Sequence, residues 1–577
     1  MVRDAGPPTS NQLMALRELQ YMAEVQGSDA PRHTQQAVTA VLTPVSFVAG
    51  DRWSMAERAG TRVRLATLPW PLFVILAAQT VLSARLLTSN TAFVDESTYL
   101  YVGSQELNHW IHGIPVLDYQ TSLPGAPVVY PPLAAIVNAV GGLVAARVLS
   151  LCCMLGTTAL LYATTKRILD GRAAVLGTAL FAGLAGTQFL GAFATFDAIG
   201  LFLLVLATYL AVGWTDAHNT LTDVAASSVV AAVALALANA ADYSTTLWDP
   251  VVIGLTMCAP VLAGQPWRYG IGRGLRLSVG AALFIGAGLA VGKAKYIQGI
   301  VGTTVARSTG TEGMGQSPSL VLHDAWKWVG VVVVLAAVGV LLTLIPEKNR
   351  PSAAAVRGAS ILTIALLAVA AILAPVIQAR IGTTVSLQEH VIFGGWFGCV
   401  AAGYALSRVL RHRALAGICA CALILVLSAL DLPIANGFYQ WPTENMAFVS
   451  GLKKLVRPGD QQYLIEGYAD IPAYYVGAVY SFQWQDAGAF PYTDPQTGKS
   501  YYGAPAFADA IKHRAFTLII LNFTEASHGE PANDYLIAAD IAKYGGYQIA
   551  GHLPPSDSSS DNFYTVWRVT EGNLCHS

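Results

Sequence analysis

Two carboxylates, Asp95 and Glu96, stand side by side in the run Phe93-Val-Asp-Glu-Ser-Thr-Tyr, directly after the first long apolar segment. A third, Asp197, begins another apolar segment. Carboxylates brought close together raise the pKa of one of them, which suits a general base near neutral pH. The alternative is helix capping, because acids are favoured at helix N-termini. The residues alone leave both interpretations open.

A second set of candidate residues is cationic and lies near the ends of later apolar segments: Lys293, Lys295, Arg307, Arg380 and His390. Side chains of this kind bind phosphate through charge-assisted hydrogen bonds. We therefore expect them to bind the phosphate of an anionic lipid. The alternative is that the long side chains only reach from a membrane span to the water interface.

The composition determines which solvent must surround these residues. The chain has 577 residues, of which 54% are hydrophobic and only 12% are charged, with a mean hydropathy of +0.49. Soluble proteins carry about 25% charged residues. A soluble enzyme and a disordered protein are therefore excluded, and a net charge of −1 gives no reason to expect nucleic acid as a partner. Most of the chain is expected to lie in a lipid bilayer.

A span needs about twenty apolar residues, and eleven segments meet that requirement. They are residues 66–87, 143–165, 173–193, 198–214, 222–240, 248–264, 276–296, 326–345, 358–377, 389–408 and 414–432. The sequence therefore predicts an α-helical multi-pass membrane domain over 61–435, preceded by a cytoplasmic tail, 1–60. The short apolar stretch from Tyr130 to Gly142 opens with two prolines and is expected to lie along the outer membrane surface.

The distribution of Lys and Arg sets the orientation, because cytoplasmic loops hold an excess of them. The first external loop, 88–142, contains neither residue type. The segments assigned to the cytoplasm contain Arg58, Arg62, Arg64, Lys166, Arg167, Arg172, Arg268, Arg273, Arg276, Lys348, Arg350, Arg357, Arg408, Arg411 and Arg413. Eleven spans with the N-terminus inside place the C-terminus outside.

Residues 436–577 differ in composition, being rich in Tyr, Asp, Gly and Pro. Strands are expected at 462–466, 516–522, 547–552 and 563–569, with helices at 505–514 and 533–544. This alternation predicts a small extracytoplasmic α/β domain. Its aromatic residues, including Tyr501 and Tyr502, are candidates for stacking on the sugar of an acceptor. The alternative is that they form the domain's own core.

Taken in order, several motifs resemble the C-type glycosyltransferase superfamily, whose members take sugars from polyprenyl-phosphate carriers. The closest similarity is to the protein O-mannosyltransferases and the bacterial aminoarabinose transferases. The motifs are Asp95-Glu96 with Tyr99, His112-Gly113, Tyr130-Pro131-Pro132-Leu133, Gly142 through Ala146-Arg147, Lys166-Arg167, Arg172-Ala-Ala and Phe196-Asp197. The match is close over about 90–215 and extends to the later spans only by topology.

The resemblance implies an inverting transfer to an acceptor hydroxyl, with Asp95 as the general base and 88–142 as the catalytic loop. Asp197 would orient the acceptor or support the base, Glu96 would support the site, and Tyr99 would contact the acceptor. The implied partners are a polyprenyl-phosphate-linked sugar, membrane lipid and an extracytoplasmic glycan, lipid or protein, in a bacterial plasma membrane. No obligatory metal is expected because the sequence shows no compact ligand cluster, although some relatives use a divalent ion.

Two further functional classes remain open from the sequence. A transporter or flippase of lipid-linked sugars would fit the many spans, but such proteins often show internal repeats and broken helices at the midplane. The sequence shows no convincing repeat, and its acids are expected outside rather than within the spans. A non-catalytic scaffold that presents 436–577 is the other, and it would leave Asp95 and Asp197 with capping roles alone.

Overall fold

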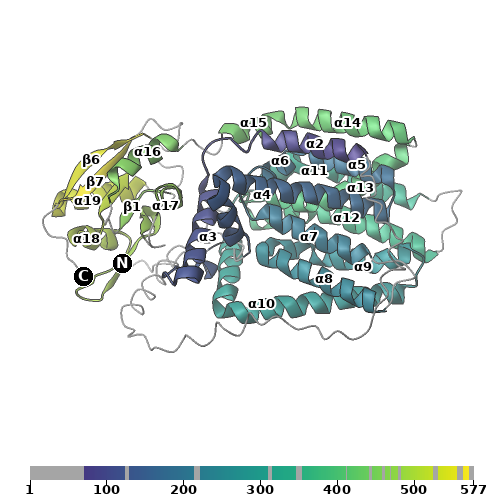
Figure 1. Cartoon of the computed structure of the whole chain (residues 1–577), viewed down its shortest axis with the longest axis horizontal. Helices are drawn as coiled ribbons and strands as arrows, with labels where there is room; N and C mark the ends of the chain where they lie inside the picture. The colour runs from purple at the N-terminus through teal and green to yellow at the C-terminus, as the bar shows by residue number, and fades with distance from the viewer. Residues whose placement is uncertain are drawn as a thin grey trace, which may run out of the picture.

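The computed structural model describes residues 70–121, 123, 129–213, 221–309, 315–345, 354–410, 412–440, 445–457, 462–467, 469–477, 483–523, 531–554 and 563–570. The predicted tail, 1–60, lies outside these residues. A helical bundle and a smaller domain of strands and helices follow each other along the chain (Figure 1). The smaller domain lies against one end of the bundle, next to helix α3 (Val94–His112).

The helical part contains fourteen described α-helices. They are α2 (Trp70–Ala84), α3 (Val94–His112), α4 (Tyr130–Ile168), α5 (Gly171–Gly183), α6 (Ala185–Leu190), α7 (Asp197–Gly213), α8 (Leu221–Ala241), α9 (Asp249–Leu262), α10 (Trp267–Thr309), α11 (Pro318–Leu344), α12 (Ala354–Ile381), α13 (Leu387–Val409), α14 (Arg413–Leu430) and α15 (Leu432–Gln440). Short 3₁₀ turns, η1 (Tyr119–Thr121) and η2 (Tyr243–Trp248), lie between them.

Six described helices are long and apolar enough to cross a membrane, and the number is seven if the bent pair α14–α15 is counted as one span. The six helices are 130–168, 243–262, 267–292, 318–344, 354–381 and 387–409. Helices α2, α7 and most of α8 are apolar but shorter. The chain is therefore a multi-pass membrane protein, while the count of eleven spans stays a prediction.

Two predicted segments are interrupted in the structure. Helix α4 loses helical geometry at Gly141 and Gly142, where the sequence analysis had divided a surface helix from a span. The predicted span 173–193 is not one helix, because Leu184 adopts an extended conformation and separates α5 from α6. This segment is buried along its whole length, so neighbouring helices rather than lipid cover the break.

Close backbone contacts fix the helices that carry the candidate site. A Cβ on Gly103 of α3 would lie only 2.0 Å from the carbonyl oxygen of Pro131, so α3 crosses the start of α4 at a distance that leaves no room for a side chain. A Cβ on Gly177 would lie 2.4 Å from the carbonyl oxygen of Cys399, which brings α5 equally close to α13. Small residues at helix crossings are the usual means of tight packing in membrane proteins.

The C-terminal domain contains a mixed five-stranded sheet in the order β2-β1-β5-β7-β6. Strand β1 runs parallel to β2 and β5, whereas β7 runs antiparallel to β5 and β6. The strands are β1 (Tyr463–Ile465), β2 (Trp484–Asp486), β5 (Leu518–Leu521), β6 (Tyr547–Leu553) and β7 (Tyr564–Val569), and the hairpin β3 (Pro491–Thr493) with β4 (Ser500–Tyr502) stands apart. The helices are α16 (Met446–Leu455), α17 (Asp470–Val476), α18 (Ala504–Lys512) and α19 (Pro531–Tyr544).

The predicted α/β character of this domain is confirmed. The four predicted strands correspond to β1, β5, β6 and β7, and the two predicted helices correspond to α18 and α19. Strands β2, β3 and β4, of three residues each, were not predicted.

Candidate functional site

The first turn of α3 separates two neighbouring carboxylates. Successive residues of a helix point about 100° apart, so adjacent side chains face different surroundings. Glu96 is fully buried, whereas Asp95 is exposed. The helix begins without a side-chain cap, since its N-cap residue is Phe93. Asp95 therefore stands where an incoming molecule can reach it, and Glu96 faces the protein interior.

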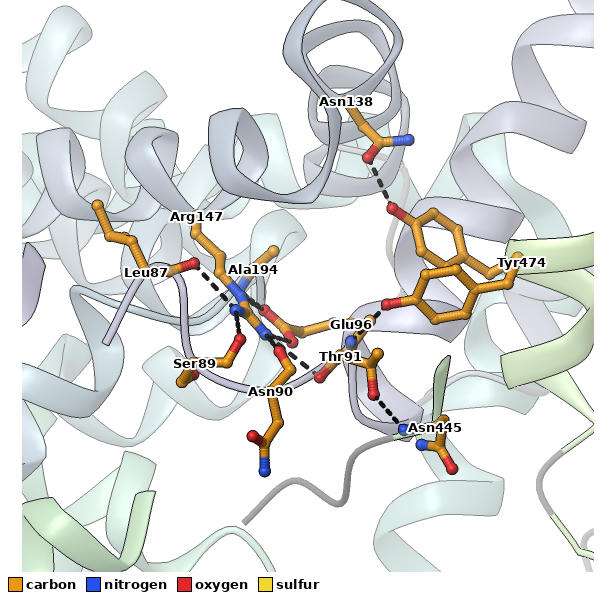
Figure 2. A network of polar contacts seen from close by, with 12 residues as sticks. Leu87, Ser89, Asn90, Thr91, Glu96, Asn138, Arg147, Ala194, Asn445 and Tyr474 are labelled. Atoms are coloured by element: carbon orange, nitrogen blue, oxygen red, sulfur yellow. Dashed lines mark hydrogen bonds and ion pairs between the residues drawn. The ribbon is translucent and has the colours of Figure 1, made fainter. Parts of the chain in front are cut away.

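Glu96 forms a bidentate ion pair with Arg147 of α4 (Figure 2). The Arg147 Nε donates to Glu96 Oε1 at 2.8 Å, and Nη2 donates to Oε2 at 2.7 Å. The other guanidinium hydrogens bond to four backbone carbonyls of the loop before α3, those of Leu87, Ser89, Asn90 and Thr91. One buried pair thus fixes the loop, the start of α3 and the second half of α4 together.

The same pair also positions the segment that carries Asp197. The backbone N–H of Ala194, three residues before Asp197, donates to Glu96 Oε1 at 2.7 Å. The Arg147 guanidinium lies 5.2 Å from the centre of the Phe193 ring. Because both contacts converge on one ion pair, the start of α3 and the start of α7 are held in a fixed relation.

The charges of four carboxylates act on Tyr99, which lies on the next turn of α3. Burial raises the pKa of the Tyr99 phenol well above its ordinary value, and the charges of Asp95, Asp197, Asp242 and Glu389 raise it further in that order. These acids come from the starts of α3, α7, η2 and α13. The fold therefore brings these four helix starts close enough to Tyr99 for their charges to act on it.

Asp242 and Glu389 were not singled out from the sequence. Asp242 is buried against α7, since a Cβ on Gly200 would lie 2.9 Å from the Asp242 Cβ. Glu389 is 7% exposed; its Oε1 accepts from Gln388 Nε2 at 3.1 Å, and its Oε2 has no hydrogen-bond partner. A lone acid at a helix start looks like a cap, so no sequence signal distinguished Glu389.

Helix α17 of the C-terminal domain packs on α3 beside this site. Thr98 Oγ1 donates to Asp470 Oδ2 at 2.7 Å, and the Ala92 N–H donates to the Tyr475 hydroxyl at 2.7 Å. Tyr474 packs against the cluster that contains Tyr99, and its hydroxyl donates to Asn138 Oδ1 at 2.8 Å (Figure 2). Burial raises the Tyr474 pKa to about 12 and keeps the hydroxyl protonated as a donor.

Solved structures with a similar fold match most of this chain. The Archaeoglobus fulgidus oligosaccharyltransferase, tethered to an acceptor peptide with the NVT sequon, matches with a TM-score of 0.51 and 12% identity over 87% of this chain and 74% of that chain. Archaeal oligosaccharyltransferase AglB from the same organism, in complex with an inhibitory peptide and a dolichol-phosphate, gives a TM-score of 0.50 at 12% identity, covering 88% and 75%. The chain has the fold of the C-type membrane glycosyltransferases. The fold class that the sequence predicted is therefore confirmed.

A looser similarity, with a TM-score of 0.41 and 12% identity, extends over 87% of this chain and 98% of ArnT from Cupriavidus metallidurans. No protein-family model and no curated protein matches the sequence. The comparisons thus establish the C-type fold, and the roles of individual residues depend on the geometry above.

Within this C-type fold, Arg380 and His390 lie at helix ends, whereas Lys295 lies within α10. Lys295 of α10 forms an ion pair with Asp118 of the loop 88–142, with 2.8 Å between Nζ and Oδ2. Arg380 lies exposed in the last turn of α12, and His390 lies half-buried in the first turn of α13, next to Glu389. The side chains of Lys293 and Arg307 lie outside the described part of α10.

The predicted acceptor-contacting tyrosines lie in two different places. Tyr99 is buried between Tyr130 and Phe196, with ring centres 6.3 and 4.9 Å away. Tyr501 is half-buried and Tyr502 is exposed on β4 of the separate hairpin. The domain packs on α3 mainly through α17 and not through this hairpin, so contact of all three tyrosines with one acceptor stays a prediction.

Carboxylate oxygens are ligands for divalent cations, so Asp95, Asp197 and Glu389 are the residues that could hold one here. Among the described residues, however, one set of three His, Cys, Asp or Glu residues has its ligand atoms within 4.8 Å of one another. This set lies in the C-terminal domain and consists of Asp494, Asp509 and His513.

Proposed function

We propose that this chain is an inverting membrane glycosyltransferase that moves a sugar from a polyprenyl-phosphate donor to a hydroxyl of an extracytoplasmic acceptor. The observation that carries the proposal is the exposed Asp95 held by the buried Glu96–Arg147 pair beside Asp197, within a C-type fold. The dolichol-phosphate bound to the similar AglB supports a donor of this class.

In the proposed reaction, Asp95 takes the proton of the acceptor hydroxyl as that oxygen attacks the anomeric carbon. The bond from the anomeric carbon to the phosphate oxygen breaks, and polyprenyl phosphate departs from the opposite face with both bonding electrons. A phosphate leaves without protonation, so one base is sufficient. Carboxylates held close together favour proton uptake by one of them, which suits a general base.

The remaining residues have supporting roles in this proposal. Asp197 orients the acceptor, and Glu96 positions Asp95 through Arg147 without touching substrate. Lys295, Arg380 and His390, with Lys293 and Arg307, stabilise the charge of the departing phosphate. Tyr99, Tyr501 and Tyr502 contact the acceptor side. Residues 88–142 and 436–577 lie outside a bacterial plasma membrane, where lipid-carried sugars replace cytoplasmic nucleotide sugars.

The test is transfer from a panel of polyprenyl-phosphate sugars carrying labelled mannose, glucose, arabinose or aminoarabinose, offered to full-length protein in nanodiscs with a cell-envelope extract as acceptor. Asp95→Asn keeps the size of the side chain and should lower the rate by about a hundredfold to ten-thousandfold. Glu106→Gln, on the same helix, is the matched control and should transfer normally. An Asp95→Asn variant that folds normally and transfers at the wild-type rate would remove Asp95 from the mechanism.

The same preparation separates the other two functional classes. A flippase would move the labelled donor between leaflets of proteoliposomes without forming product, and a scaffold would do neither. Product formation that depends on Asp95 contradicts both alternatives.

A further inference from the structure

A second group of ligand-type side chains lies in the C-terminal domain, where the β3–β4 hairpin meets α18. Asp494 follows the last residue of β3, and Asp509 and His513 are four residues apart on and just after α18. A spacing of four places two side chains on the same helix face. One ligand atom from each of the three residues lies within 4.8 Å of the other two.

The two helix residues face each other without a hydrogen bond. Asp509 Oδ2 and His513 Nδ1 are 3.5 Å apart, and both atoms are buried without a hydrogen-bond partner. That separation exceeds the usual range for an N–H···O bond. Buried polar atoms left unsatisfied are costly and are rare in native proteins. A ligand that attracts both a carboxylate oxygen and an imidazole nitrogen would satisfy them together.

Asp494 is the most deeply buried member, at 5% exposure. Its Oδ1 accepts from the Gln496 N–H at 2.8 Å, and its Oδ2 accepts from Thr497 Oγ1 at 2.5 Å. These bonds hold the carboxylate in one orientation, while each oxygen keeps a second lone pair. The Tyr492 ring stacks on the His513 ring, with centres 6.4 Å apart, and limits its rotation.

We propose that Asp494, Asp509 and His513 form a binding site for a zinc-class divalent cation that joins the β3–β4 hairpin to α18. Around a tetrahedral zinc ion, with ligand bonds of about 2.0–2.1 Å, the ligand atoms lie about 3.4 Å apart. The Asp509–His513 pair already has this spacing. The ligand atom of Asp494 lies within 4.8 Å of the other two. It would therefore have to move closer by at most about 1.4 Å to reach the spacing of a tetrahedral zinc site.

The chemistry of the ligands selects the metal. A histidine nitrogen with two carboxylates suits zinc, whereas calcium and magnesium prefer oxygen ligands alone. Three protein ligands leave a fourth position for water. Asp494 belongs to the hairpin whose second strand, β4, carries Tyr501 and Tyr502. The ion would therefore hold this hairpin against α18. The proposal does not depend on the proposed transferase reaction.

The test uses full-length protein in nanodiscs, stripped with a chelator, dialysed and titrated with zinc chloride by calorimetry. The wild type should bind about one zinc ion at this site, and Asp509→Asn and His513→Gln should each weaken that binding by at least about tenfold. The matched controls are Asp540→Asn on α19 and His552→Gln on β6, which should bind like the wild type. An Asp95→Asn variant identifies any zinc bound at the transferase site.

Hydrogen exchange of the wild-type protein gives a second measurement that needs no variant. Zinc should slow amide exchange in residues 491–513, and calcium at the same concentration should not. If zinc binding is equal in the triad variants and their controls, or if zinc leaves exchange in 491–513 unchanged, the contact between Asp509 and His513 is a plain ion pair and the site does not exist.

Discussion

Asp95 and Glu96 show how one helix turn assigns different roles to adjacent acids. Glu96 accepts hydrogen bonds from Arg147 on both oxygens and from the Ala194 N–H on Oε1, so protein donors hold both carboxylate oxygens. Asp95 lies exposed on the other side of the same turn. The sequence predicted the pair as a unit, and the long-range partner Arg147 decided which acid faces the site.

We expect Glu96→Gln to destabilise the protein strongly. It would leave the Arg147 charge buried without its counter-ion, a change that costs about 3–5 kcal/mol. Glu96→Gln combined with Arg147→Met should recover part of that loss because no buried charge remains. Denaturant unfolding in detergent measures both effects. Lys327→Ala, which breaks the exposed pair with Asp324, should change stability by less than about 1 kcal/mol, and a Glu96→Gln variant as mild as this control would contradict the prediction.

A second residue-scale prediction concerns pH. Burial, together with the neighbouring Asp534 carboxylate, raises the pKa of Glu466 to about 8. The stabilisation from the protonated form is therefore fully present below the ordinary carboxyl pKa and is lost as the pH rises through about 8. Protection of the Asn522 and Phe523 amides, which donate to Glu466 and Asp534, should fall over that range after correction for intrinsic exchange. Glu466→Gln should remove this pH dependence.

At the scale of the elements, regular patterns predicted most of the architecture. The alternation of strands and helices in 436–577 was predicted from the sequence, and so was the division of α4 at Gly142. The break at Leu184 was not, because its cause is packing and not composition. The role of α17 was also missed, because seven residues with two tyrosines carry no sign that they contact a helix more than 350 positions earlier.

The crossing of α5 and α13 yields the third prediction. A Cβ on Gly403 would lie 2.4 Å from the carbonyl oxygen of Ala173, and a Cβ on Gly177 would be equally close to Cys399. Gly403→Ala should force the two helices apart and cost about 1–3 kcal/mol. Thermal unfolding in detergent measures the loss. The control is Gly286→Ala on α10, where no atom lies within 4 Å of the added Cβ; equal behaviour of the two variants would show that the contact is not tight.

At the scale of the whole molecule, the C-terminal domain packs against the end of the bundle that carries Asp95 and Tyr99, because α17 lies on α3. The predicted orientation places this end outside the cell. The loop between α9 and α10, next to Arg268, should then face the cytoplasm.

Single cysteines test that orientation directly. Ala539→Cys on α19 and Ala263→Cys after α9 both place a thiol at an exposed position. An impermeant maleimide should label Ala539→Cys in intact cells and Ala263→Cys only after permeabilisation. The unsubstituted protein gives the background from its own cysteines, and the reverse labelling pattern would invert the topology.

The contact of α5 with α13 and α14 also has a consequence for biosynthesis. Helix α5 leaves the ribosome about two hundred residues before its partners, yet it is buried and packs on both of them. During that interval, its glycine-bearing face has only lipid or earlier helices to contact. A nascent chain that stops after α12 would keep this face open, and we expect the membrane's quality-control proteases to degrade it. The centre of the bundle is therefore synthesised early and enclosed only when α14 arrives.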